Sequence, residues 1–184
     1  MKSKRILSVC VALVALALVS APVSGLLIDT FNTSQTVSDN DGTTDFNTAG
    51  PDATNILGSY RYVEVQRGTG TGVVEAKVND ASSGYYALSC PENTSGRSLI
   101  RWDANGSGLG GADFTDSGTD DKLHIRARTD LGYTLLVTAT DTTSSSATRA
   151  QAIAGGSTLF ADYYLDYASF TGSIDWTDIS KLEF

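Results

Sequence analysis

Short runs in which apolar and polar residues alternate constrain this chain more than any other feature. The clearest is KLHIRAR at 122–128, where Leu123, Ile125 and Ala127 occupy every second position and the residues between them are charged or histidine. A period of two places the apolar side chains on one face of an extended strand. We therefore expect a half-buried strand here, with Lys122, His124, Arg126 and Arg128 facing outward.

The closing segment, 163–184, shows the same alternation and is the clearest sign of the fold. It predicts a strand, a turn at 171–173, an anchoring Trp176 and a final short strand. The large residues of the two strands are Tyr163, Leu165, Tyr167, Ile179, Leu182 and Phe184.

Similar runs recur along the chain, separated by Gly, Asp, Asn, Ser and Thr. Residues 32–55 and 104–121 are expected to be long polar loops, and residues 146–154 are ambiguous between a strand and one turn of helix. The fold class predicted is all-β: a jelly-roll-like antiparallel β-sandwich of roughly eight to ten strands. The further strands are expected at 26–31, 56–67, 73–80, 85–90, 98–103, 132–140 and 146–154.

The first 25 residues have the pattern of a secretory signal peptide. Three cations in MKSKR precede an uncharged apolar run that ends in small residues. That run is shorter than the roughly 20 residues a membrane span prefers, and no second one follows. We expect residues 26–184 to form one secreted or cell-surface domain, with no membrane span in the mature chain.

Charge excludes some partners. The whole chain has a formal net charge of −8, and loss of Lys2, Lys4 and Arg5 with the signal peptide changes it to −11. Nucleic acid is a poor partner for such a chain. Cys90 is the only mature cysteine, and we expect it to be a small buried residue, the alternative being a disulfide between chains.

Several segments together resemble secreted, surface-associated bacterial proteins of the PEP-CTERM-associated type, whose activity is unknown. They are LLIDTF, ILGSYRYVEV, VVEAKVND, RWDANGSGLGGADFT and YYLDYASFTGSIDWTDISKLEF. The first and last are also similar, more loosely, to the ends of jelly-roll carbohydrate-binding modules. Proteins of the surface group usually continue past the position of Phe184. The resemblance therefore implies either a longer chain or a sheet with an unpaired edge that docks a strand from another copy.

Two groups of acidic residues are candidates for structural Ca²⁺, which prefers clustered oxygen ligands. Asp39, Asp41 and Asp45 surround a glycine in DNDGTTD, although the spacing does not match a full EF-hand loop. The resemblance to jelly-roll modules implies a second site between the first and last strands. Its candidate ligands are Asp29, Asp175 and Glu183.

A sugar-binding face is the main candidate for a ligand site, since planar rings stack on sugar rings while charged groups bind hydroxyls. The candidates we favour are Tyr60, Tyr62, His124, Arg126 and Arg128. Trp102 and Trp176 are expected in the core instead. Less favoured candidates for the same face are Arg61, Arg101, Trp102, Tyr163, Tyr164 and Tyr167.

No arrangement of residues fixes an enzymatic activity. The sequence has no G-x-S-x-G elbow, zinc motif or Walker loop. A carboxylate pair such as Glu64 and Glu75 could be proposed for glycoside hydrolysis, but nothing in the spacing distinguishes it from ordinary surface charges. We expect a non-enzymatic module that binds extracellular polysaccharide. The alternatives are a structural subunit that assembles with other copies of itself by strand donation and, third, an enzyme acting on glycosides.

Overall fold

Strands form where apolar and polar residues alternate. The computed structural model describes residues 26–79, 84–156 and 159–184, and in it strand β3, Arg61–Arg67, buries Arg61, Val63 and Val65 while the residues between them lie nearer the surface. The strands are β1 Gln35–Asp39, β2 Asp45–Ala49, β3 Arg61–Arg67, β4 Val74–Val78, β5 Tyr86–Ser89, β6 Gly96–Trp102, β7 Lys122–Ala127, β8 Tyr133–Asp141, β9 Ser146–Ile153, β10 Ala161–Asp166, β11 Thr171–Gly172 and β12 Ile179–Glu183.

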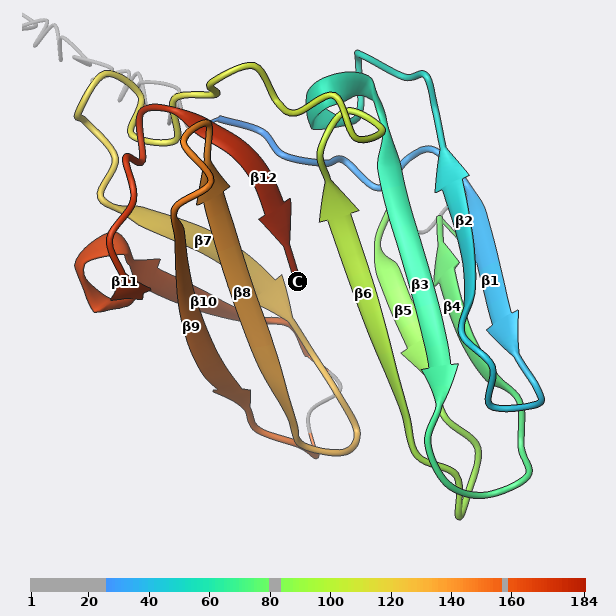
Figure 1. The fold of residues 1–184 in the computed structure, drawn as a ribbon. Coiled ribbons are helices and arrows are strands. Elements are labelled where there is room, and N and C mark those ends of the chain that lie inside the picture. The colour runs from blue at the N-terminus through green and yellow to red at the C-terminus, as the bar shows by residue number, and fades with distance from the viewer. Residues whose placement is uncertain (1–25, 80–83, 157–158) are drawn as a thin grey trace, which may run out of the picture.

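The strands are arranged in two layers, as a sandwich. One layer is a seven-stranded sheet in the order β11-β9-β8-β12-β6-β3-β2. The other layer consists of two smaller sheets, β1-β4-β5 and β10-β7, and every strand pair is antiparallel. Figure 1 shows β10 and β7 behind the half of the large sheet that contains β8 and β9, with β5 behind β6 and β3 and with β1 at the right, beside β2. The all-β sandwich predicted from the sequence is confirmed.

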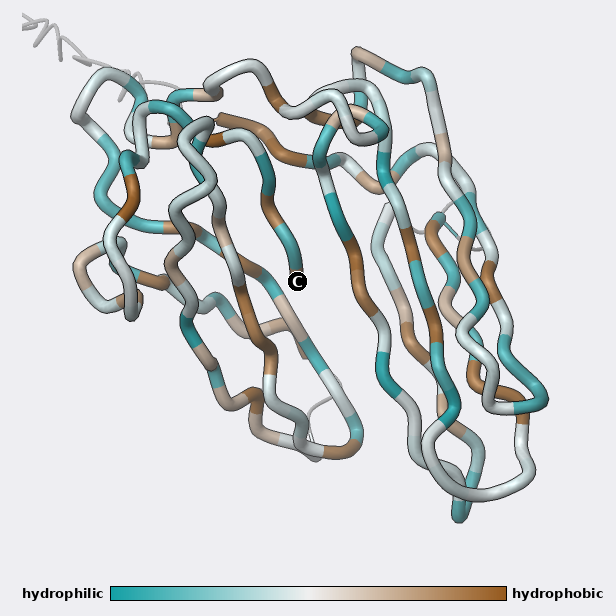
Figure 2. Tube along the Cα trace, in the orientation of Figure 1, coloured by the Kyte–Doolittle hydropathy of each residue, from teal (hydrophilic) through white to brown (hydrophobic). Residues whose placement is uncertain are grey.

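The core lies between the layers. Apolar residues recur along the middle of β3, β6 and β8, while most connecting turns are polar (Figure 2). Val65, Val137, Ile179 and Leu182 are fully buried, and Trp102 is 1% exposed. The prediction that Trp102 belongs to the core is therefore confirmed.

A buried ion pair holds the start of the described chain against the large sheet. Both carboxylate oxygens of Asp29 accept hydrogen bonds from Arg61 Nη1, at 3.0 and 2.9 Å, and Trp102 Nε1 donates to Asp29 Oδ2 at 2.9 Å. Arg61 also donates to Gln35 Oε1 and to the Thr33 carbonyl. Arg61 is thus a structural residue, and the suggestion that it helps to form a sugar-binding face was wrong.

Two expectations for the N-terminal third were wrong. Residues 26–31 form no strand, only an isolated bridge between Asp29 and Ile56. The segment expected to be one long loop, 32–55, contains β1 and β2, which belong to different sheets and pair with β4 and β3. The sequence did not indicate these strands because their residues are mainly polar. Strand β2, for example, exposes all but its last residue and so lacks an apolar face.

The C-terminal half also differs in detail from the expectation. Residues 146–153 are a strand that forms a hairpin with β8, so the helical alternative is excluded. Thr171 and Gly172, expected in a turn, pair with β9 as β11. Strand β12 is not an edge strand, because it pairs with β8 on one side and with β6 on the other.

Cys90 is exposed rather than buried, which corrects the expectation for this residue. The signal peptide predicted for residues 1–25 lies outside the described residues. Within the described part of the chain, no helix has the length and apolar character needed to cross a membrane.

Candidate functional site

The outer surface of the two-stranded sheet carries a group of exposed planar side chains. Strand β7 packs Leu123, Ile125 and Ala127 against the core, so the alternate residues His124 and Arg126 face outward. Strand β10 pairs with it in register, which brings Asp162 opposite Arg126 and Tyr164 opposite His124. We call this surface the β7–β10 face and define it by its outward and adjoining residues: His124, Arg126, Arg128, Asp162, Tyr164, Phe160 and Tyr85.

A stacked pair of rings lies at the centre of this face. The rings of His124 and Tyr164 are 4.8 Å apart and 12° from parallel. Asp162 Oδ1 lies 2.8 Å from His124 Nε2 and 3.2 Å from Arg126 Nε. Tyr164 is nevertheless 58% exposed, and the side chain of Arg126 is 63% exposed. The pair is therefore held in place and still accessible to a ligand.

A second group of rings continues the β7–β10 face. The guanidinium of Arg128 lies 4.9 Å from the centre of the Phe160 ring and 5.7 Å from that of Tyr85. Arg126 also lies over Phe160, at 5.8 Å. Such cation–π contacts orient the two guanidinium groups, whose N–H groups are hydrogen-bond donors suited to hydroxyl and carboxylate oxygens.

Tyr62 belongs to another surface, the outer side of the seven-stranded sheet. Its ring stacks on Phe46 of β2 with centres 5.5 Å apart, and the guanidinium of Arg101 lies 4.2 Å from it. The Tyr62 hydroxyl donates to Glu64 Oε2 at 3.0 Å, and burial raises the pKa of this phenol. Phe46 is 66% exposed. We call these four residues the β2–β3 face.

The structure therefore splits the five favoured sugar-binding residues. His124, Arg126 and Arg128 come together on the β7–β10 face, whereas Tyr62 lies on the β2–β3 face. Tyr60 precedes β3 and packs so closely on Gly50 that a Cβ there would come within 2.8 Å of its ring. The sequence placed these residues on strands but could not show that the strands lie in different layers.

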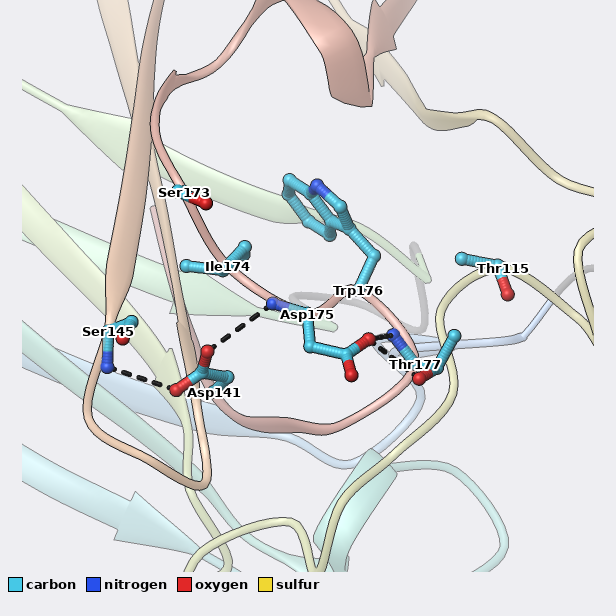
Figure 3. Close-up of a pocket in the computed structure, with 8 residues that line it drawn as sticks. All are labelled: Thr115, Asp141, Ser145, Ser173, Ile174, Asp175, Trp176 and Thr177. Carbon is cyan, nitrogen blue, oxygen red and sulfur yellow. Dashed lines mark hydrogen bonds between the residues drawn. The ribbon is translucent and has the colours of Figure 1, made fainter.

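An open hollow of about 610 Å³ lies at the end of the sandwich near the β8–β9 turn. Its lining includes Trp176, whose ring stacks on Tyr167 with centres 4.1 Å apart, and the carboxylates of Asp141 and Asp175 (Figure 3). Trp176 is thus only partly buried, although we expected it in the core. The hollow presents one ring, two carboxylates and several hydroxyls.

Both carboxylates in the hollow are bound by their own turns. Asp141 accepts hydrogen bonds from Thr143, from the Ser145 N–H and from the Asp175 N–H (Figure 3 shows the last two). The Thr143 hydroxyl makes the largest contribution to lowering the pKa of Asp141, and the Thr177 hydroxyl does the same for Asp175. Neither group has the raised pKa needed by a general acid.

The first predicted calcium group forms the connection between β1 and β2. Asp39 is fully buried and accepts hydrogen bonds from the backbone N–H groups of Asp41, Gly42 and Arg67. The Arg67 N–H contributes most to lowering its pKa. Asp41 accepts from the Thr43 N–H, and Asp45 lies in β2. These contacts give Asp39 a structural role that needs no metal.

The second predicted calcium group is dispersed. Asp29 is paired with Arg61, Asp175 lies in the hollow, and Glu183 lies on the outer side of β12, 3.1 Å from Lys181 Nζ. Among the residues the structure describes, no three acidic, histidine or cysteine side chains are grouped so that they could share a metal ion. Calcium binding stays a prediction without a ligand set.

Three residues of the β7–β10 face were missing from the sequence-based candidates: Asp162, Phe160 and Tyr85. The alternation of Asp162, Tyr164 and Asp166 around buried Leu165 was a usable sign that these residues face outward. Nothing in the sequence placed Tyr85 beside Arg128, because that contact joins segments far apart in the chain.

Comparisons with known proteins give no further guide to the site: no protein-family model, curated protein or solved structure matches this chain.

Proposed function

We propose that this protein is a secreted, non-enzymatic module of the cell surface or extracellular matrix that binds polysaccharide through its β7–β10 face. The observation that carries the proposal is the exposed Tyr164–His124 stack, flanked by the Asp162 carboxylate and the Arg126 guanidinium. The C–H groups on one side of a sugar ring pack on an exposed aromatic ring by dispersion. The carboxylate accepts hydrogen bonds from hydroxyl groups, and the guanidinium donates to them.

The shape of the site supports a polymer rather than a small molecule. Small-molecule sites are usually concave and enclose most of the ligand. The β7–β10 face is instead the surface of two paired strands, with two groups of rings along it. An extended chain of sugars can contact both groups at once.

The test is retention on a panel of immobilised glycans, followed by titration with a ligand that is retained. We expect Tyr164→Ala to lower affinity about tenfold, or about 1.4 kcal/mol, as for a ring at the centre of an interface. Leu131→Ala is the control, because this side chain is 75% exposed in the β7–β8 connection. Retention on none of the panel, or equal affinity of the Tyr164 variant and the wild type, would refute the proposal.

An enzyme acting on glycosides is less well supported. Such an enzyme needs two facing carboxyl groups, one of them with a raised pKa. The carboxylates in the hollow, Asp141 and Asp175, both have lowered pKa values. Their turns use them as hydrogen-bond acceptors, which is what a structural role requires.

Assembly by strand donation is the second candidate, favoured by one observation. Among the strands that the structure describes, residues 96–99 of β6 pair only with β3, and residues 133–137 of β8 pair only with β9. Their other edges offer N–H and C=O groups to an added strand. Light scattering on the concentrated protein, with and without calcium, tests this candidate, and a strictly monomeric protein would exclude it.

A further inference from the structure

We propose that the β2–β3 face is a second binding face for the same class of ligand, so that one molecule cross-links two polysaccharide chains. This inference rests on the proposed function and adds the number and position of the sites. It comes from a comparison of the two exposed clusters, which lie in different layers of the sandwich.

Both faces present the same three chemical groups. Each has an exposed aromatic ring stacked on a second ring: Tyr164 on His124, and Phe46 on Tyr62. Each has a guanidinium over a ring, that of Arg128 in one case and that of Arg101 in the other.

Each face also has a carboxylate bound to its ring system. Asp162 bonds to His124, and Glu64 accepts from the Tyr62 hydroxyl. On each face a guanidinium is also paired with a carboxylate, Arg126 with Asp162 at 3.2 Å and Arg101 with Asp103 at 2.9 Å, so that these charges largely cancel while the groups keep their hydrogen-bonding capacity. We therefore infer that the ligand is a neutral, hydroxyl-rich polysaccharide rather than a polyanion.

The two faces point away from each other. Tyr62 and Glu64 alternate with Arg61, Val63 and Val65, which face the core, so they lie on the outside of the large sheet. His124 and Arg126 alternate with buried Leu123 and Ala127 on the other layer. The sandwich thus separates the faces, and a polymer chain bound to one leaves the other accessible to a second chain.

Titration with short ligands tests the number of sites. The probes are neutral hexasaccharides of β-1,4-glucan, β-1,3-glucan, mannan and xylan. We expect two ligands per wild-type molecule and one ligand for each of Phe46→Ala and Tyr164→Ala. Phe46 is 66% exposed, so its loss leaves the fold intact, which a melting curve verifies. Leu131→Ala is the control and keeps two sites.

Turbidity with the corresponding polymer tests cross-linking directly. The wild type and Leu131→Ala are expected to aggregate the polymer, whereas each single-face variant binds without aggregating it. One site in the wild type, lost in Tyr164→Ala and unchanged in Phe46→Ala, overturns the second face and leaves the proposed function standing. Absence of binding to every hexasaccharide overturns both.

Discussion

Replacement of Asp29 by alanine is expected to destabilise the protein strongly. The substitution removes both bonds to the Arg61 guanidinium and leaves the Trp102 Nε1–H and the Phe31 N–H without an acceptor. The Arg61 side chain is 0% exposed, so its charge would stay buried without a counter-ion. Breaking a buried ion pair in this way costs about 3–5 kcal/mol. For a domain of this size, that corresponds to a fall in Tm of about 6–20 °C.

A double substitution separates the charge from the packing. In Asp29→Ala/Arg61→Met no charge is buried, so we expect it to recover part of the stability lost by Asp29→Ala alone. Urea unfolding monitored by tryptophan fluorescence measures all three proteins, with Asp130→Ala as a surface control.

The same measurement distinguishes the ion pair from the predicted calcium site. If Asp29 acts through Arg61, its loss costs the same in calcium as in chelator. A loss of less than about 1 kcal/mol would refute the reasoning. A loss seen only in calcium would instead make Asp29 a calcium ligand.

Two further predictions concern single positions. Gly172→Ala should lower the free energy of unfolding by about 1 kcal/mol or more, because φ is +118° and the new Cβ would lie 2.3 Å from the Ser146 carbonyl oxygen. Gly106→Ala is the control and should cost less, because Gly106 has a φ of +86° but no atom within 4 Å of the new Cβ. Equal losses for the two variants in urea unfolding would contradict the steric argument. Stability should fall below about pH 4. The pKa of Asp141 is lowered in the folded protein, so its carboxylate stabilises the fold above the unfolded-state pKa, and this stabilisation is lost as the pH falls through the folded-state pKa. Asp141→Asn should therefore be less stable than the wild type at pH 6 and closer to it at pH 3, and parallel pH profiles would exclude this account.

The sequence located most strands because burial on one side requires apolar residues at every second position. The outward positions of β7 followed from this pattern alone. Strands β1 and β2 were missed for the same reason. Only the last residue of β2 is buried, and β1 buries Gln35 and Asp39 beside Val37, so its inward residues are mainly polar.

The candidate site was only partly predictable. Alternation identifies an outward-facing residue, but it does not say which layer that residue belongs to. His124 and Tyr62 therefore looked equivalent in the sequence, although the sandwich separates them. The same holds for Asp29, which the resemblance to jelly-roll modules made a candidate calcium ligand, because only the tertiary structure shows its ion pair with Arg61.

The sequence by itself determined that the chain is all-β and, for a strand such as β7, which side chains face outward, because both properties depend on neighbours two residues apart. Only the tertiary structure decided which strands share a sheet, where β12 inserts, and which rings, carboxylates and guanidinium groups meet on each face. Those contacts join residues far apart in the chain, such as His124 with Asp162 and Phe46 with Tyr62. They depend on strand order and register, which local alternation does not specify.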